Sequence, residues 1–277
     1  MRVVVLGTGT PNNDPERSGP ATAIVVGDMA YLIDAGPGVV RRAAEATAAH
    51  GLRGLVPSQL GKVFITHLHS DHTLGLPDVM LGNWVLDRMF PIDVYGPPGT
   101  KELTDGIVSA WAIDLDIRMN GPEPHNEPHY RAITTEIEPG EIYSDEHVTV
   151  EAIPVPHANW PHAYGYKFTG GGRTIVISGD TKPAESLVAA CSGCDVLVHE
   201  VYSAEAWERR TPDWQAYHAD AHTSTIELAE IARRAQPKLL VLYHQLYWGA
   251  SDDDLLREIR EAGYEGDVVS ARDLDIY

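Results

Sequence analysis

Long apolar runs are missing from this chain, and cysteine and positive charge are scarce. No run of about 18 apolar residues occurs anywhere, which excludes a membrane-spanning helix of ordinary length. The first residues pass directly into an apolar strand pattern and are too short for a signal peptide. We therefore expect a cytoplasmic protein with no membrane partner. Its hydrophobic content of 43% and charged content of 22% are those of an ordinary globular protein.

Positive charge is outnumbered by negative charge in this sequence. The 277 residues include 21 Lys and Arg against 40 Asp and Glu, which leaves a net charge of −19. A field of this sign repels polyanions. The basic doublets at 41–42, 209–210 and 233–234 are isolated, and the last two are predicted to lie on helix faces. Because no stripe of Lys and Arg is present to neutralise a phosphate backbone, the composition disfavours a long RNA or DNA as a partner.

Cysteine occurs only as Cys191 and Cys194, in a C-x-x-C pair. A zinc or redox role would need a second pair or a thioredoxin-like context, which the sequence lacks. We therefore expect two reduced, half-buried thiols. No serine lies in a G-x-S-x-G turn and neither cysteine has a histidine within sequence reach, so the sequence indicates no side-chain nucleophile.

Short strand patterns are frequent and are separated in places by helical patterns. Helices are predicted at residues 38–50, 101–110, 182–190, 225–235 and 253–262, and Ser224 with Glu227 forms a capping box at the start of the fourth. The order begins as a β-meander and later alternates strands with helices, which is typical of a layered α/β sandwich. The strands are predicted at residues 3–6, 23–26, 31–33, 63–66, 92–95, 148–153, 164–168, 174–178, 196–198, 239–243 and 267–270.

No repeat, charge block or low-complexity linker divides the chain, so we expect one domain over residues 1–277. Residues 120–130, with three prolines and two histidines, are predicted to form a loop. Residues 77–131 as a whole are expected to form an elaboration that carries Trp84 and Trp111. The expected role of this elaboration is packing or the face of a homodimer, with pocket lining as the alternative.

The most informative segment places three histidines and an aspartate within one turn of chain, directly after the apolar residues 63–66. Neutral imidazole and carboxylate are the ligands that Zn²⁺ and similar cations prefer. If the strand ends at residue 66, side-chain alternation points the first two histidines to the same side. The segment therefore predicts a metal site formed by His67, His69, Asp71 and His72.

Further donors follow other apolar strands at the point where each strand ends. His157 follows residues 148–153, Asp180 follows residues 174–178, His199 and Glu200 follow residues 196–198, and His244 follows residues 239–243. Open α/β sheets place their chemistry at the carboxyl ends of strands. We expect these side chains to converge on one edge with the opening cluster.

Residues 67–72 match the pattern H-x-H-x-D-H, by which the sequence resembles the metallo-β-lactamase superfamily. Within that superfamily the chain most resembles the ribonuclease Z branch, through residues 6–11, 31–36, 179–181, 199–200 and 222–224. The resemblance spans nearly the whole chain. It implies a four-layer αββα sandwich and a metal-dependent hydrolase.

The resemblance also implies a role for each candidate residue. One metal would take His67, His69 and His157, the other would take Asp71, His72 and His244, and Asp180 would bridge them. The implied ions are two Zn²⁺ per chain, although Mn²⁺ and Fe accept the same nitrogen and oxygen ligands. Asp34 would orient a ligand histidine. The implied catalytic residues are Asp71, Glu200 and His222, with Glu200 orienting His222 towards the oxyanion or the leaving group.

These parts imply that a metal-bridging hydroxide attacks an ester-type substrate. Ribonuclease Z enzymes commonly carry a long tRNA-binding arm between the equivalents of His157 and Asp180, and this chain has room there for one strand and a glycine turn only. We therefore expect a small substrate: a phosphodiester, a lactone or carboxylic ester, or an aryl sulfate. The alternatives are a tRNA 3′-processing endonuclease and a non-catalytic or redox member of the fold.

Aromatic and polar residues close to the predicted ligands leave two alternatives open. Trp160 and His162 follow His157, and Trp248 follows His244. They either line an apolar pocket for a small ligand or pack at its rim. His125, His129 and His147 are not expected to bind a metal.

Overall fold

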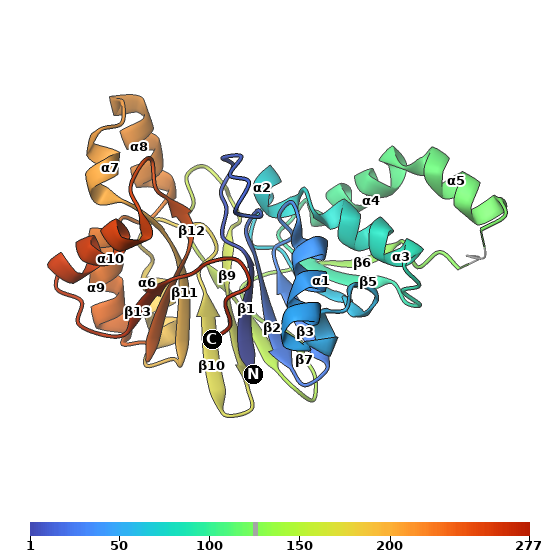
Figure 1. The fold of residues 1–277 in the computed structure, drawn as a ribbon, viewed down its shortest axis with the longest axis horizontal. Helices are drawn as coiled ribbons and strands as arrows, with labels where there is room; N and C mark the ends of the chain where they lie inside the picture. The colour runs from blue at the N-terminus through green and yellow to red at the C-terminus, as the bar shows by residue number, and fades with distance from the viewer. Residues whose placement is uncertain (124–126) are drawn as a thin grey trace. The chain divides into compact units, whose positions relative to one another are not determined.

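The computed structural model describes residues 1–123 and 127–277, which form two compact units that interleave in sequence. Unit 1 comprises Met1–Gly7, Pro15–Ile137 and Asp273–Ile276, and unit 2 comprises Thr8–Asp14, Glu138–Arg272 and Tyr277. Each unit contains one mixed β-sheet with its own helices (Figure 1). The expectation that residues 1–277 form a single domain stays a prediction.

Unit 1 is built on a six-stranded sheet in the order β1-β2-β3-β4-β5-β6. Neighbours from β1 to β3 are antiparallel and neighbours from β3 to β6 are parallel. Val4 and Leu32 on this sheet pack with Val39 and Ala43 of the first helix in one buried cluster. The strands are β1 (Arg2–Gly7), β2 (Ala21–Val26), β3 (Met29–Ile33), β4 (Lys62–Phe64), β5 (Ile92–Gly96) and β6 (Ala132–Glu136).

The helical segments of unit 1 include a short helix at the predicted metal site and a run of helices in the predicted elaboration. In that elaboration Trp84 is buried and donates its Nε1 hydrogen to the carbonyl of Glu127 at 3.1 Å, whereas Trp111 is 42% exposed. The segments are α1 (Val39–His50), 3₁₀ turns at Arg53–Leu55 and Pro57–Gln59, α2 (Ser70–Thr73), a π-helical turn at Asp78–Gly82, α3 (Asn83–Val85), α4 (Thr100–Ala110) and α5 (Ala112–Asn120).

Unit 2 is built on a seven-stranded sheet in the order β13-β12-β11-β10-β9-β8-β7. Neighbours from β7 to β10 are antiparallel and neighbours from β10 to β13 are parallel. Leu197 and Leu240 of the parallel strands share a buried cluster with Leu187, Leu228 and Leu255 of three helices. The strands are β7 (Gly140–Ser144), β8 (Thr149–Pro154), β9 (Tyr164–Gly170), β10 (Arg173–Ile177), β11 (Val196–Tyr202), β12 (Leu239–Leu246) and β13 (Val268–Ser270).

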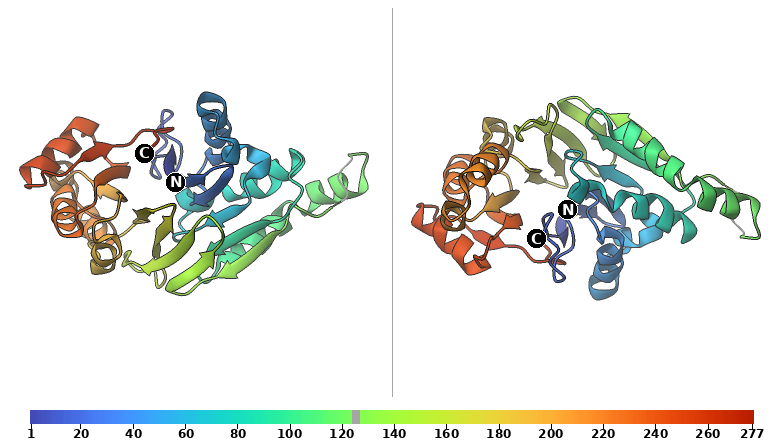
Figure 2. Two further views of the ribbon diagram at one scale, coloured as in Figure 1. Left: turned by 90° about the horizontal axis from the view of Figure 1, so that it is seen from below. Right: turned by 90° about the horizontal axis from the view of Figure 1, so that it is seen from above.

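The three helices of that cluster are α6 (Glu185–Cys191), α9 (Thr225–Ala235) and α10 (Asp252–Glu261), which lie together beside the parallel strands (Figure 2). Two further helices, α7 (Ala204–Glu208) and α8 (Pro212–Ala221), follow β11. The capping box at the start of α9 is confirmed, because the Ser224 hydroxyl accepts from the Glu227 amide and the Glu227 carboxylate accepts from the Ser224 amide.

The predicted strands and helices are all found, with ends that differ by a few residues. The sequence patterns did not predict β6, β7, α5, α7 or α8. Strands β6 and β7 are largely exposed and lack a buried alternating face, and α8 presents polar or exposed residues around most of its surface. Residues 121–123 and 127–130 of the predicted loop form bends and turns, whereas residues 124–126, which include His125, lie outside the described residues.

The expectation of two reduced thiols is wrong, because Cys191 and Cys194 form a disulfide and both are buried. The physical reason is the turn between them. Helix α6 ends at Cys191, Ser192 and Gly193 both adopt positive φ, and the chain reverses so that the two cysteine Cα atoms lie 4.7 Å apart. This distance is within the range that a disulfide spans.

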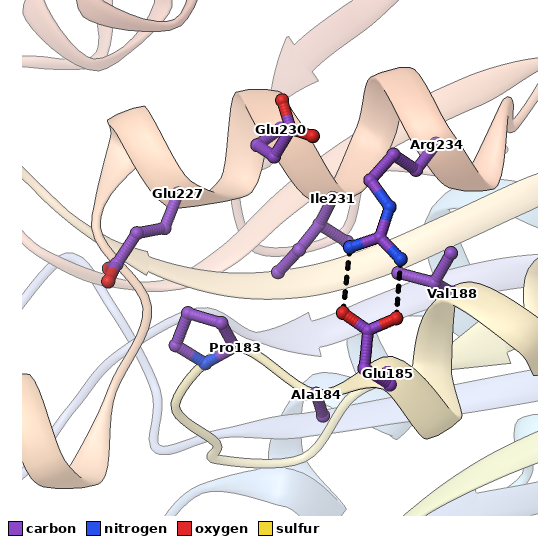
Figure 3. A pocket seen from close by; sticks show the side chains of 8 residues that line it. All are labelled: Pro183, Ala184, Glu185, Val188, Glu227, Glu230, Ile231 and Arg234. Carbon is purple, nitrogen blue, oxygen red and sulfur yellow. Dashed lines mark hydrogen bonds and ion pairs between the residues drawn. The ribbon is translucent and has the colours of Figure 1, made fainter.

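A small hollow of about 200 Å³ lies on unit 2 between α6 and α9 (Figure 3). Arg234 closes one side of it through two hydrogen bonds to Glu185. None of the predicted site residues lines it. Among the described residues, no helix is both long enough and apolar enough to cross a lipid bilayer. The cytoplasmic location and the homodimer stay predictions.

Gly36 sets how closely the loop after β3 approaches the predicted metal site. A Cβ atom on Gly36 would lie 2.6 Å from the backbone nitrogen of Pro20 and 2.8 Å from the carbonyl oxygen of Asp71. Real Cβ atoms do not approach backbone atoms this closely, so the backbone would have to move. The loop therefore has room for glycine only.

We expect Gly36→Ala to lower the free energy of unfolding by about 1–3 kcal/mol, because added atoms in a tight site force backbone shifts. Urea unfolding of the purified variant measures this loss. Gly106→Ala in α4 is the matched control: its Cβ would meet nothing within 4 Å, and alanine is the better helix former, so stability should hold or rise slightly. Equal unfolding curves for Gly36→Ala and the wild type would contradict the steric argument.

Candidate metal centre

The first donor set lies in unit 1 at residues 67–72. Strand β4 ends at Phe64, two residues earlier than predicted, and α2 begins at Ser70. His67 and His72 are fully buried and Asp71 is 8% exposed. The His67 Nε2 atom lies 2.9 Å from His69 Nδ1, and the ring centroids of His67 and His72 are 4.3 Å apart. The structure therefore brings these donors together, as the sequence predicted.

Asp34 anchors this donor set from the end of β3. Its carboxylate accepts hydrogen bonds from the backbone amide and the hydroxyl of Thr66, at 2.8 Å and 2.9 Å. The same carboxylate lies 2.7 Å from His72 Nδ1. Because an ionised carboxylate only accepts, His72 carries its proton on Nδ1 and keeps Nε2 as a lone-pair donor. Asp34 thus orients the imidazole of His72, and the roles predicted for both residues stay predictions.

The conformation of Asp34 shows how firmly this arrangement is held. Its φ angle is 61°, in the left-handed region that most side chains avoid. Its amide donates to the carbonyl of Phe64 at 2.9 Å, and the next amide, of Ala35, donates to the carbonyl of His72 at 2.8 Å. Such strain is maintained only when surrounding contacts over-determine it. The strand end and the metal-binding turn are therefore joined through backbone as well as side chain.

The second donor set lies in unit 2, where residues at the ends of three strands meet. His157 follows β8, Asp180 follows β10, and His244 lies within β12. Each of the three side chains is at most 2% exposed. His244 Nε2 lies 3.6 Å from Asp180 Oδ2, and His222 Nδ1 lies 4.0 Å from the same oxygen. Asp180, His222 and His244 together form a group of donor atoms with metal-binding spacing.

His244 owes its direction to a β-bulge. Glu200 of β11 pairs with Tyr243 and Val201 pairs with Gln245, so His244 is the extra residue of β12. Its φ angle is 46°. Bulges bend a strand and re-aim one side chain, and they occur often beside active sites. The strand pattern located His244, but it did not predict the bulge that turns the imidazole towards Asp180.

Glu200 and His222 form a pair beside these donors. Glu200 is fully buried, and its Oε1 atom accepts from the amides of Thr181 and Thr223 at 3.2 Å and 3.0 Å. Glu200 Oε1 also lies 3.3 Å from His222 Nδ1. Burial raises the pKa of the Glu200 carboxyl well above its usual value, and the nearby Asp180 charge acts in the same direction. The catalytic roles expected for Glu200 and His222 stay predictions.

His157 is oriented by the last turn of α8. Its Nδ1 atom donates to the carbonyl of Ala221 at 2.7 Å, which leaves Nε2 as its lone-pair donor. The same hydrogen bond pairs one of the carbonyls at the end of α8 that have no partner within the helix. Because His222 directly follows Ala221, one short segment positions both a predicted metal ligand and a predicted catalytic residue.

The aromatic residues and histidines that the sequence placed near the predicted ligands differ in their burial. Trp160 packs against the core of unit 2, His162 is exposed and Trp248 is half-buried. His129 and His147 belong to none of the donor groups found among the described residues.

Sequence reasoning missed an aromatic patch next to His222. His218 stacks on Trp214 with ring centroids 5.4 Å apart and lies 5.9 Å from the His222 ring. Tyr217 lies 6.5 Å from the same ring. The spacing of positions 214, 217 and 218 places them along one face of α8, directly before His222, and this signal could have located the patch once a helix was predicted there.

Comparisons with known proteins agree with this geometry. A profile of the beta-lactamase superfamily domain matches residues 30–245. Ribonuclease Z of Mycobacterium bovis (strain BCG / Pasteur 1173P2) is 30% identical over 284 aligned residues, which cover 99% of this chain and 96% of that protein. The metallo-β-lactamase fold protein YhfI from Bacillus subtilis has a TM-score of 0.75 at 18% identity, covering 100% of this chain and 98% of that one. The short form of human tRNase Z has a TM-score of 0.71 at 23% identity, covering 100% and 98%.

The chain therefore belongs to the metallo-β-lactamase superfamily and is a homologue of the ribonuclease Z enzymes. Its fold is the metallo-β-lactamase fold, with two mixed sheets flanked by helices, so the α/β sandwich predicted from the sequence is confirmed. It is a metal-dependent hydrolase of that superfamily.

We expect Asp34→Asn to lower metal affinity about 10–100-fold, the usual cost of losing a hydrogen-bonded partner of a ligand histidine. The amide can keep one hydrogen bond, but it loses the charge that holds His72 with its proton on Nδ1. Competition with a chromogenic chelator measures the affinity. Asp93→Asn, at the partly exposed ion pair with Lys62, is the matched control and should bind metal as the wild type does. Unchanged affinity in Asp34→Asn would remove Asp34 from the metal site.

Proposed function

We propose that the predicted ligands hold two divalent cations in one dinuclear centre, and that Zn²⁺ is the first candidate. Membership of the metallo-β-lactamase superfamily supports this proposal. His67, His69 and His157 would hold one ion, Asp71, His72 and His244 would hold the other, and Asp180 would bridge them.

The orientation of the imidazoles is the observation that carries this proposal. Nδ1 of His72 donates to Asp34 and Nδ1 of His157 donates to the Ala221 carbonyl, while Nδ1 of His67 lies 3.0 Å from the Thr66 hydroxyl. Metal-binding histidines almost always engage one ring nitrogen in this way and present the other to the metal. The donor set of imidazoles and carboxylates fits Zn²⁺, Mn²⁺ and Fe.

The chain's own residues then supply acid–base chemistry beside the metals. When bound, two cations lower the pKa of a shared water and stabilise negative charge on the substrate. His222 lies beside the donors Asp180 and His244, where it would donate a proton to the leaving group or a hydrogen bond to the oxyanion. Glu200, whose Oε1 atom lies 3.3 Å from His222 Nδ1, would hold the His222 ring in position.

We propose a small ester-type substrate, with a phosphodiester as the first candidate and lactones, carboxylic esters and aryl sulfates after it. The connection from His157 to Asp180 supports a small substrate, because it consists of the β9–β10 hairpin with a tight turn at Gly171 and Gly172. The net charge of −19 supports it as well, because the protein would repel a long polyanion.

A second candidate is a tRNA 3′-processing endonuclease, which the name of the Mycobacterium bovis relative favours. That protein aligns with this chain almost from end to end, so neither has a long segment that the other lacks. The short hairpin therefore separates the two proteins less than the sequence alone suggested. Charge remains the stronger argument against a tRNA substrate for this chain.

We expect the purified protein to contain about two divalent cations per chain and to hydrolyse bis-p-nitrophenyl phosphate. Metal analysis joined to a screen with aryl sulfates, lactones and precursor tRNA tests both statements. His67→Ala should lose metal and activity together, because one ion would keep only part of its ligands. Less than one tightly bound metal per chain, with activity unaffected by His67→Ala, would overturn the dinuclear centre. Clean 3′ cleavage of precursor tRNA would favour the second candidate.

We expect His222→Ala to lower kcat by about 10²–10⁴-fold, the range for removal of a general acid, while metal content stays at the wild-type level. Glu200→Gln should also lower kcat, because the amide keeps the hydrogen bonds to Thr181 and Thr223 but removes the ionisable carboxyl group in contact with His222. His147→Ala provides a surface control with wild-type activity. A His222→Ala variant that loses its metals would show that His222 is a ligand and not an acid.

A further inference from the structure

A cation, Arg210, lies within the aromatic patch beside His222 and has no acidic partner among the described residues. The guanidinium carbon of Arg210 lies 5.6 Å from the ring centroid of Trp214 and 5.1 Å from that of Trp248. Its Nε atom is buried and makes no hydrogen bond to any described residue. In the part of the chain that the structure describes, the Arg210 side chain also forms no ion pair with a carboxylate.

This isolation is unusual in a chain with so many acidic groups. Arg257, for comparison, contacts the carboxylates of Glu205, Asp254 and Glu261. Arg210 is partly exposed to solvent, and a guanidinium that no described carboxylate contacts attracts anions. The Arg210 guanidinium is therefore available to an anion that comes from outside the chain.

The position of Arg210 corrects one expectation from the sequence. The doublet at 209–210 was predicted to lie on a helix face, but it forms the connection between α7 and α8. This connection is held in place, because Trp207 Nε1 donates to the Gln215 carbonyl and the Gln215 amide donates to the Trp207 carbonyl. The connection thus directs Arg210 towards Trp214 and Trp248.

Trp248 lies outside α8 and contacts both His218 and Arg210. It follows β12 with a φ angle of 44° and lies 4.4 Å from His218, measured between ring centroids. A tryptophan in this strained conformation indicates that the surrounding structure holds it there. Burial lowers the pKa of His218 to about 4, so His218 is neutral at pH 7 and leaves Arg210 as the cation of the patch.

The outer rings of the patch are open to solvent. Trp214 is 49% exposed and Tyr217 is 41% exposed, and the two rings meet edge to face at 5.8 Å. Exposed indole and phenol rings stack with planar groups, and guanidinium forms strong hydrogen bonds to anionic oxygens. Together they fit a planar group that carries a negative charge.

We propose that Arg210, Trp214 and Trp248 form a subsite that binds the non-reacting part of the substrate, and that this part is an aromatic ring bearing an anionic group. The proposal rests on the proposed function only for the identity of the reacting ester. The ring would stack on Trp214 near His222, and the anionic group would pair with Arg210. The subsite therefore selects among small esters.

Three small probes separate stacking of a planar ring from binding of a negative charge in the full-length, metal-loaded protein. Benzoate is planar and anionic, benzamide is planar and neutral, and cyclohexanecarboxylate is anionic and not planar. We expect benzoate to bind most tightly, as measured by calorimetry and by quenching of tryptophan fluorescence. Arg210→Gln should weaken benzoate about tenfold without changing benzamide, because it removes a charged hydrogen-bond donor and keeps the rings.

Trp214→Ala should weaken benzoate and benzamide by about three- to tenfold, because it removes the stacking surface. Arg209→Gln and Trp111→Ala are matched controls, since Arg209 adjoins Arg210 and Trp111 is an exposed tryptophan of unit 1. Both should bind all three probes as the wild type does. If Arg210→Gln leaves the affinity for benzoate unchanged, the proposed subsite is wrong. Binding of benzoate at the metals alone would give this result.

A kinetic comparison keeps this proposal separate from the proposed function. Bis-p-nitrophenyl phosphate and methyl p-nitrophenyl phosphate share a leaving group and differ in whether the retained group is aromatic. The ratio of their kcat/KM values should favour the aromatic ester and should fall several-fold in Trp214→Ala. Hydrolysis of neither ester, with benzoate binding still dependent on Arg210, would reject the phosphodiester function and keep the subsite. Hydrolysis with an unchanged ratio and unchanged benzoate binding would reject the subsite alone.

Discussion

The burial of carboxylate and imidazole groups at the ends of strands is the constraint on which the rest of this structure depends. A carboxylate taken out of water is costly unless hydrogen bonds replace its hydration. Asp34 meets this condition by accepting from the amide and hydroxyl of Thr66 and by contacting His72. Glu200 meets it by accepting from two backbone amides and by contacting His222. A buried acid therefore contacts an imidazole of each donor set: Asp34 contacts His72, and Glu200 contacts His222.

The two units meet this constraint with the same architecture. Each sheet has an antiparallel part and a parallel part, and in each a buried acid orients an imidazole: Asp34 orients His72, and Glu200 contacts His222. Parallel strands end at a common edge, where loop residues can be placed with the precision of the sheet. The positive φ angles of Asp34 and His244 show that the backbone at these ends adopts conformations that isolated residues avoid.

The sequence alone predicted most residues of the candidate site, because its signals are local. Residues 67–72 combine four donors in one turn, and His157, Asp180 and His244 each follow an apolar run that reads as a strand. What it did not locate depends on non-local or conformational detail. The bulge at His244 needs the register with β11, and the disulfide of Cys191 and Cys194 needs the reversal at Ser192 and Gly193. The sequence did not predict helix α8, because an exposed helix lacks the apolar periodicity by which helices are predicted.

The net negative charge of the protein limits the kind of substrate that it can bind. A long nucleic acid brings many phosphates to a protein whose net charge is −19, and each of them needs a cation that this surface does not offer as a stripe. A small anion needs only one or two. Arg210, held between Trp214 and Trp248 without an acidic partner among the described residues, provides one beside His222. The field of the whole protein is screened beyond about 10 Å in salt, whereas a contact at a half-buried guanidinium is not. Within that distance the acidic surface still repels the many phosphates of a polyanion, whereas the proposed subsite needs only one guanidinium to bind a small anionic ester.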